Sequence, residues 1–227
     1  MTKEIDQLIA NFRPPAFPGS YFISFEGIEG AGKSTQIIQT QRYLESLNFR
    51  VLVLREPGGT SFGEKLRKAI LESNSPIHPV AEMHLFASSR AQLLHEVTLK
   101  ELAVPGTIII YDRYIDSTIA YQGMGRGLGI EAVLKTHQSF PLTLVPHLTL
   151  YIAIGLNTSH LRQNKRQIPK DYFERQGNDF YQKLIDGYEK SHELFPERVF
   201  KIDGEKDESF VFEEIKRAVH HLIERVR

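Results

Sequence analysis

The stretch YFISFEGIEGAGKST, residues 21–35, joins a short apolar run to a glycine-rich loop that ends in Lys-Ser-Thr. Gly27, Gly32, Lys33 and Ser34 have the G-x-x-x-x-G-K-[ST] spacing of a phosphate-binding P-loop, between a predicted strand and a predicted helix. Such glycines let successive backbone N–H groups converge on one anion, and the helix N-terminus adds partial positive charge. The stretch therefore predicts a nucleotide site; a glycine turn with an incidental lysine is the alternative.

The composition is that of one globular domain with a substantial core. Of the 227 residues, 41% are hydrophobic and 25% are charged. Lys plus Arg and Asp plus Glu each number 28, so no net charge favours nucleic acid or an anionic membrane as a partner. The absence of cysteine excludes disulfides and cysteine-ligated metals. No apolar run approaches the ~20 residues of a membrane span, and we expect a cytoplasmic protein.

Apolar runs and helical patterns alternate along the rest of the chain. The runs predict a buried strand at 50–54 and further strands at 107–111, 147–154 and 198–202. Helical patterns cover 61–73, 80–104, 173–188 and 208–226. This alternation predicts the three-layer α/β fold of P-loop NTPases, a parallel sheet of about five strands with helices on both faces.

Three segments fall outside the regular pattern. Residues 1–20 indicate a short helix and a proline-rich tether, an N-terminal extension before a single domain at 21–227. The glycine-rich residues 123–129 predict a flexible loop. The basic segment at 157–170 has little apolar content, so it is either a solvated surface or a cationic lid, which we place at about 157–172.

Polar residues at strand ends and on one helix are candidates for a ligand site. Arg55 and Asp112 each follow or end a predicted strand, at the sheet edge where ligands of α/β proteins collect. Arg55 is either an anion ligand or an ion-pair partner, and Asp112 either a magnesium contact or an ordinary strand-end carboxylate. Phe86 and Arg90 share one helix face, where a core ring and a surface ion pair are the common outcome.

Five motifs in this order resemble thymidylate kinase, the family that phosphorylates dTMP to dTDP. They are FEGIEGAGKST (25–35), REPGGT (55–60), FASSRAQL (86–93), DRYIDSTIAYQG (112–123) and GRGL (125–128). The resemblance implies a nucleoside monophosphate kinase domain with ATP as donor, dTMP as acceptor and Mg²⁺ as cofactor. It also implies a homodimer, which a second apolar patch at Leu85, Leu99 and Ala103 favours.

The resemblance assigns two groups of binding residues. For ATP it implies Gly27, Ile28, Glu29, Gly30, Ala31, Gly32, Lys33, Ser34 and Thr35. For dTMP it implies Glu29, Arg55, Phe86, Arg90, Arg113, Ser117, Tyr121 and Gln122. In the family, the counterpart of Phe86 stacks on thymine and that of Arg90 bonds the edge of the base. The counterparts of Arg55 and Arg113 hold the phosphate, while that of Glu29 faces the sugar 3′-hydroxyl.

The implied reaction needs no general base, because a phosphate monoester is already ionised near neutral pH. What remains is the stabilisation of negative charge on the transferring group. The resemblance gives this role to Lys33, to Arg113 and to magnesium held by Ser34 with Asp112 nearby.

The resemblance also implies a further catalytic arginine, for which the sequence offers two candidate positions. Gly30 stands where some family members carry this arginine, so the sequence is similar to the branch that supplies it from the lid. Arg166 is the first candidate and Arg162 the second, although a gap-free match places Gln167 at the usual position.

Two other functions stay open at this point. A kinase of the same fold could act on another nucleoside monophosphate or on a deoxynucleoside. A nucleotide switch would need a guanine-reading motif such as N-K-x-D, which Asn164 and Lys165 do not complete.

Overall fold

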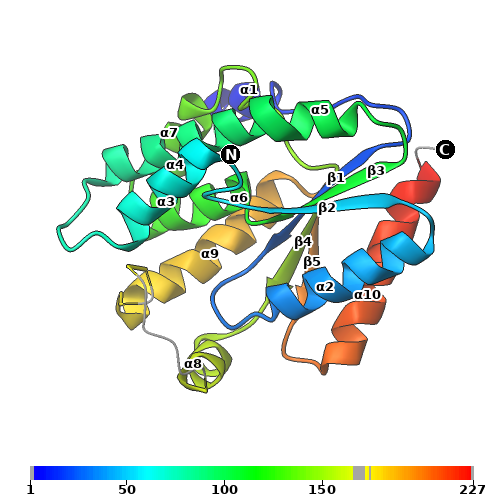
Figure 1. Ribbon diagram of the computed structural model, residues 1–227. Coiled ribbons are helices and arrows are strands. Elements are labelled where there is room, and N and C mark those ends of the chain that lie inside the picture. Colours follow the sequence, from blue (N-terminus) through cyan, green and yellow to red (C-terminus); the bar gives the residue numbers. More distant parts are fainter. Residues whose placement is uncertain (1–2, 166–171, 174, 226–227) are drawn as a thin grey trace.

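The central sheet is parallel throughout. The computed structural model describes residues 3–165, 172–173 and 175–225 (Figure 1). Within them the strands lie in the order β2-β3-β1-β4-β5. They are β1 (Tyr21–Glu26), β2 (Arg50–Arg55), β3 (Thr107–Asp112), β4 (Leu148–Ala153) and β5 (Val199–Asp203). β1 pairs with β3 and β4 and is buried along its whole length, so the predicted five-stranded α/β fold is confirmed.

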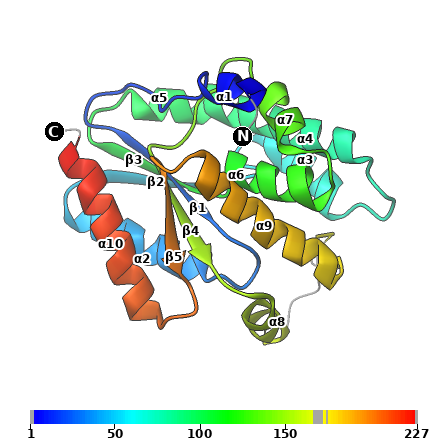
Figure 2. The same ribbon diagram turned by 180° about the vertical axis from the view of Figure 1, so that it is seen from behind.

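Helices cover both faces of the sheet. On one face α2 (Lys33–Ser46) and α10 (Glu208–Arg225) pack side by side (Figure 2). On the other side lie α3 (Ser61–Leu71), α4 (Pro79–Leu93), η1 (Leu94–Thr98), α5 (Leu99–Leu102), α6 (Ile115–Thr118), η2 (Ile119–Gly125), α7 (Ile130–Thr136) and α9 (Asn178–Leu194). α8 (Leu156–Asn164) follows the carboxyl end of β4. No helix in the described part of the chain is both long and apolar enough to span a bilayer.

The strand expected to be buried at 50–54 is instead an edge strand. β2 pairs only with β3, and its residues alternate between partly buried and exposed positions, with Val53 41% exposed. An apolar run indicates a hydrophobic strand, but the position of that strand in the sheet depends on which other strands pair with it. The prediction of a buried strand was therefore wrong.

Three further predictions also need correction. The helix expected at 80–104 changes to π-helical winding in η1, where the Thr98 hydroxyl donates to the Leu93 carbonyl (3.3 Å). Gly123 and Gly125 belong to η2 rather than to a flexible loop, and a Cβ on Gly125 would lie 2.7 Å from Phe180 of α9. Phe173 precedes α9 instead of starting it. Close packing on α9 explains this glycine better than flexibility does.

The N-terminal extension lies on the domain. Its helix α1 (Lys3–Ile9) is placed beside α7, where Glu4 pairs with Lys135 at 2.7 Å. Asn11 donates to the side chain of Gln138 (2.7 Å), and the Val145 N–H donates to the Arg13 carbonyl (3.1 Å). The division into an extension and a domain at residue 21 stays a prediction.

A buried ion pair joins α6 to the start of β5. Asp116 accepts from both terminal nitrogens of Arg198 (2.8 and 2.9 Å), from Thr149 (3.2 Å) and from Ser191. Both charged groups are almost fully buried. Burial opposes the ionisation of Asp116, but the Arg198 guanidinium and the hydrogen bonds hold its pKa below the usual value. The carboxylate is thus charged at neutral pH and depends on Arg198.

Replacing Arg198 with methionine should lower the free energy of unfolding by about 3–5 kcal/mol, because Asp116 would stay buried without its counter-charge. Urea denaturation followed by circular dichroism measures the change. As the matched control, Lys201→Met removes an exposed pair with Glu189 (2.7 Å) and should leave stability nearly unchanged. Equal midpoints for the two variants would contradict the structural role of the Arg198 pair.

Candidate active site

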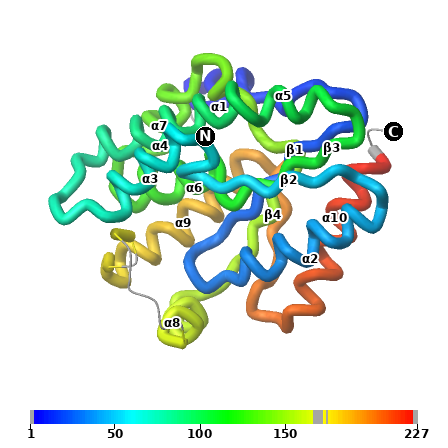
Figure 3. Tube along the Cα trace, viewed as in Figure 1, coloured from blue at the N-terminus to red at the C-terminus, as the bar shows by residue number. Residues whose placement is uncertain are grey.

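The P-loop lies where β1 ends and α2 begins, at the carboxyl edge of the sheet (Figure 3). Gly27 has φ 137°, and a Cβ there would lie 2.5 Å from the carbonyl oxygen of Ile152, so only glycine fits. The Lys33 ammonium lies across the loop and donates to the carbonyls of Gly27 (2.8 Å) and Ile28 (3.3 Å). Burial and the nearby Arg113 charge lower the pKa of Lys33 to about 8. Ser34 and Thr35 are exposed on the first turn of α2.

A cavity beside the P-loop gathers almost all the residues predicted for the monophosphate. Glu29, Phe86, Arg90, Arg113, Ser117, Tyr121 and Gln122 line it. They come from the P-loop, α4, the end of β3, α6 and η2, which are separate in sequence. The parallel sheet brings these segments together because the relevant strands all end at one edge.

Arg113 is the central cation of this cavity. It follows β3 with φ 73°, an uncommon conformation for a residue with a side chain, and such strain is typical of functional sites. Its guanidinium donates to Glu29 (2.7 Å), to the Tyr188 hydroxyl (2.8 Å) and to Ser117 (3.2 Å). Tyr188, a residue of α9, carries no local sequence signal that could have revealed this contact.

Glu29 links the P-loop to this cavity. Its Oε1 accepts from Arg113 and from the Tyr121 hydroxyl (2.6 Å), whereas Oε2 is buried and finds no hydrogen-bond partner among the described residues. Burial opposes ionisation, but Arg113 and Lys33 hold the pKa of Glu29 below its usual value. A charged carboxylate with one free oxygen can accept a hydrogen bond from a ligand hydroxyl.

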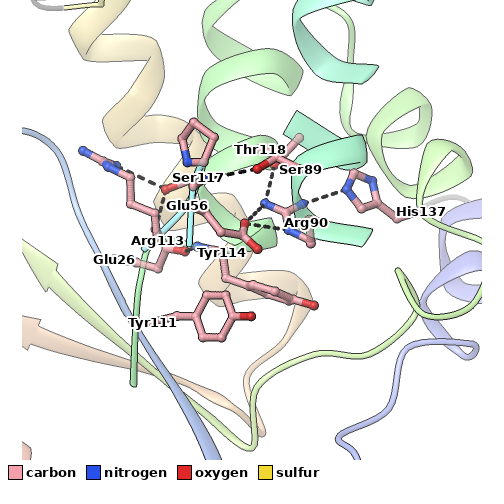
Figure 4. Close-up of polar contacts among 12 residues, drawn as sticks. Glu26, Glu56, Ser89, Arg90, Tyr111, Arg113, Tyr114, Ser117, Thr118 and His137 are labelled. Carbon is pink, nitrogen blue, oxygen red and sulfur yellow. Dashed lines mark hydrogen bonds and ion pairs between the residues drawn. The ribbon is translucent and has the colours of Figure 1, made fainter. Parts of the chain in front are cut away.

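A second carboxylate, Glu26, lies directly beneath the cavity and was missed by the sequence analysis. It ends β1 and accepts from the Tyr114 N–H and the Ser117 hydroxyl, both at 2.6 Å. Figure 4 shows Ser117 between Glu26 and Arg113. An acidic residue that closes an otherwise apolar strand just before the P-loop was the available signal.

Arg90 is buried in the wall of the cavity and is not the surface ion-pair partner that helix statistics favour. Its guanidinium is bound by Glu56, Thr118 and His137 (Figure 4). The Phe86 ring lies one turn away, half-buried, with its centroid 6.1 Å from that of Phe173. Glu56 lies inside the REPGGT motif, and its second oxygen, Oε1, is buried without a hydrogen-bond partner in the described residues.

Gln122 and Phe173 are held by a cluster around Arg126. The Gln122 amide donates to the fully buried Glu82 (2.8 Å), which also pairs with Arg126 (3.0 Å). The Arg126 guanidinium lies over the rings of Phe173 and Phe180 (5.6 and 4.9 Å). Because Phe173 also lines the cavity, this cluster connects the segment after the predicted lid to the Phe86 end of the cavity.

Arg55 is the one predicted monophosphate ligand that the structure does not bring into the cavity. Its side chain is 54% exposed and pairs with Glu64 at 3.0 Å. The cavity is instead lined by Arg67 of α3, which donates to the Pro57 carbonyl (3.1 Å) and was not predicted. Arg67 lies in an ordinary amphipathic helix, where nothing local distinguishes it from neighbouring lysines.

A second cavity lies on the other side of the P-loop. Ala31, Gly32, Thr35, Arg162 and Gly204 are among its lining residues. Arg162 donates to the carbonyls of Gly30 and Gly204, both at 3.1 Å, and so joins α8 to the P-loop and to the loop after β5. Arg166 and the other lid residues at 166–171 lie outside the described residues.

The residues predicted to hold magnesium fit such an ion. Asp112 Oδ1 is buried without a hydrogen-bond partner among the described residues, and the Ser34 hydroxyl lies at the start of α2. Oxygen donors of this kind suit Mg²⁺, which proteins usually hold with one or two side chains and the substrate phosphates. Within the described part of the chain, no three acidic, histidine or cysteine side chains form a metal-binding group.

A P-loop at the carboxyl edge of a parallel sheet, with a cavity on each side of the loop, is the arrangement of a P-loop nucleotide-binding protein. A family model described as thymidylate kinase matches residues 25–215. The chain therefore belongs to the thymidylate kinase family, as its motifs predicted.

Individual relatives agree with this assignment. A thymidylate kinase of Thermoanaerobacter sp. (strain X514) is 46% identical over 183 residues, 81% of this chain and 89% of the relative. One of Caldanaerobacter subterraneus subsp. tengcongensis is 41% identical over 202 residues, 89% and 96% of the two chains. The crystal structure of thymidylate kinase from Ehrlichia chaffeensis matches with a TM-score of 0.68 at 28% identity, covering 89% of this chain and 99% of that one.

Proposed function

We propose that this protein transfers the terminal phosphoryl group of ATP to dTMP, giving ADP and dTDP. The observation that carries the proposal is the position of Glu29, a P-loop residue that also lines the cavity containing Phe86 and Arg90. The donor phosphates on the loop and an acceptor in the cavity would therefore meet at one edge. Such juxtaposition is the main requirement of phosphoryl transfer.

The acceptor cavity has a cationic end and an aromatic end. At the cationic end, Arg113 and Arg67 supply positive charge for a monophosphate, and the free oxygen of Glu29 suits a sugar hydroxyl. At the aromatic end, the Phe86 ring offers a stacking surface for a base, and Arg90 offers donors to a carbonyl edge. Arg55 would reach a phosphate in this cavity only after leaving Glu64.

The charges around the P-loop serve catalysis. Lys33 and Arg113 would stabilise the negative charge on the transferring phosphoryl group, and no side chain needs to remove a proton from the acceptor. Ser34 and Asp112 would hold Mg²⁺, whose chemistry is to neutralise charge on the donor phosphates.

An assay of ADP release tests the proposed substrate. With ATP and Mg²⁺, dTMP should support the fastest turnover among dTMP, dUMP, dGMP, AMP and thymidine. A hydrogen-bonding pocket rejects the mismatched bases of dGMP and AMP strongly, thymidine lacks the phosphate that the arginines would bind, and dUMP lacks the methyl group of thymine. A preference for another monophosphate or for thymidine would establish the alternative kinase activity. Hydrolysis of ATP that does not respond to any acceptor would instead favour a nucleotide switch.

The lid arginine can be tested by comparing two variants. Arg166→Ala should lower kcat at least ~100-fold with little change in dTMP affinity, as expected when only a transition-state contact is lost. Steady-state kinetics and dTMP titration measure the two quantities. Arg162→Ala is the comparison, because Arg162 is already bound to the Gly30 and Gly204 carbonyls. Near-wild-type turnover of the Arg166 variant would remove Arg166 from this role.

We also propose that the protein is a homodimer. Leu85 and Leu99 are partly buried and Ala103 is exposed along the outer side of α4 and α5, as an interface helix requires. Light scattering should give about twice the 26.0 kDa mass of one chain at micromolar concentration. A particle with the mass of a single chain would reject this assembly.

A further inference from the structure

His137 lies behind the base pocket, immediately after α7, and is fully buried. Its Nε2 is 2.7 Å from Nη1 of Arg90, and its Nδ1 is 2.8 Å from the carbonyl oxygen of Val133 (Figure 4 shows the Arg90 contact). It does not line the cavity itself. Its only route to a ligand is therefore through Arg90.

The two contacts determine which ring nitrogen carries the proton. A guanidinium only donates, so Nε2 of His137 must accept from Arg90 and must be unprotonated. A carbonyl oxygen only accepts, so Nδ1 must donate to Val133. His137 is thus the neutral Nδ1–H tautomer, and burial with the adjacent Arg90 charge lowers its pKa to about 3.

The remaining partners of Arg90 restrict the plane of its guanidinium but not its rotation within that plane, since Cζ lies over the Tyr114 ring, 4.7 Å from the centroid. A single oxygen of Glu56, Oε2, contacts both Nε (2.7 Å) and Nη2 (2.6 Å) of Arg90. A contact to one oxygen allows the guanidinium to pivot about that atom within its own plane, unlike a two-oxygen bidentate pair. Thr118 accepts from Nη2 as well (3.1 Å), on the same terminal nitrogen. Among the described residues, His137 is the one that engages the other terminal nitrogen, Nη1.

We infer that His137 is a positioning residue that fixes the in-plane rotation of the Arg90 guanidinium at the angle needed to read the nucleobase edge. The inference rests on the proposed function, in which Arg90 donates to the base. His137 makes no contact with substrate in this role. It acts by removing the pivot that the single-oxygen contact with Glu56 allows.

Kinetics of two matched variants test the inference. His137→Leu removes the acceptor at similar volume and should raise the KM for dTMP ~10-fold, the scale of one hydrogen bond to a charged group. Its kcat and its KM for ATP should change less than ~3-fold, since the P-loop is untouched. His137→Gln places an amide oxygen near the Nε2 position and should restore the KM for dTMP to within ~3-fold of wild type. dUMP, which presents the same carbonyl edge, should weaken in parallel with dTMP.

The outcomes separate this inference from the proposed function. A wild-type protein that does not prefer dTMP refutes the proposed function and the inference built on it. A wild-type preference for dTMP with an unchanged KM in His137→Leu refutes the inference alone. An equal loss of kcat and of ATP affinity, without rescue by glutamine, would indicate a purely structural histidine and also refute it.

A measurement on the wild-type protein avoids any folding defect of the variants. The NMR spectrum of isotope-labelled histidine nitrogens should show His137 as a neutral ring with a proton on Nδ1 and none on Nε2, both with and without dTMP. A proton on Nε2 would place two donors face to face with Arg90, and that result would overturn the inference.

Discussion

Replacing Lys33 with methionine should lower kcat by ~10³-fold, the effect of removing one preorganised charge from a phosphoryl-transfer site. The Lys33 ammonium is buried, lies across the loop on the Gly27 and Ile28 carbonyls, and is within the field of Glu29 and Asp112. A donor phosphate on the loop would replace these weak carbonyl contacts with a contact between full charges. Methionine keeps the length and the packing of the side chain but cannot make that contact.

Rapid-mixing kinetics with ATP and dTMP at saturation would measure this loss, and thermal unfolding would show whether the fold is intact. Lys68→Met is the matched control, because Lys68 is 74% exposed on α3 and pairs loosely with Glu72 (3.9 Å). It should have wild-type kcat. If Lys33→Met kept kcat within ~10-fold of wild type, Lys33 would not be the catalytic cation proposed here.

Arg113→Met should lower kcat/KM for dTMP by at least ~10³-fold. Arg113 joins the acceptor cavity to the P-loop through Glu29 and is supported by Ser117 and Tyr188. Its removal deletes the cation at the phosphate end of the cavity and leaves Glu29 with Tyr121 as its remaining side-chain partner. Because methionine has the same backbone preference as arginine at φ 73°, the effect would come from the lost charge.

Two further variants separate the charge of Arg113 from the hydrogen bond that positions its guanidinium. Tyr188→Phe removes only the hydroxyl that supports Arg113 (2.8 Å) and should cost ~10-fold in kcat/KM for dTMP. Arg50→Met removes an exposed arginine at the opposite end of the sheet, paired with Glu101, and should have no effect. A loss below ~10-fold for Arg113→Met would mean that Arg67 alone provides the phosphate charge.

The P-loop could be predicted from the sequence because its structure is local. A P-loop is one continuous turn, and its glycines, lysine and hydroxyl are placed by neighbouring residues in the chain. The parallel sheet was predictable for a similar reason, since each strand and its following helix differ in hydrophobic period. The hydrophobic period does not reveal the order of the strands in the sheet. For this reason the apolar run of β2 predicted a buried strand, although β2 lies at the edge.

The cavity beside the P-loop that contains Phe86 and Arg113 is formed by segments that only the fold brings together. Arg55 follows its strand as the family motif requires, yet it pairs with Glu64, while Arg67, twelve positions later, faces the cavity. Which of two cations reaches a pocket depends on helix rotation and on nearby carboxylates, and neither can be read from spacing.

The sequence by itself determined the class of the protein, its P-loop and seven of the side chains that line the cavity beside it, but not Arg67. The tertiary structure decided how those side chains are held. Arg90 is buried rather than exposed because Glu56 and His137, which lie 34 and 47 positions away in the chain, meet it inside the core. Hydrogen bonds between residues so far apart in the chain depend on packing in three dimensions. The sequence therefore left open whether Arg90 forms a surface ion pair or is buried, and the fold decided that it is buried.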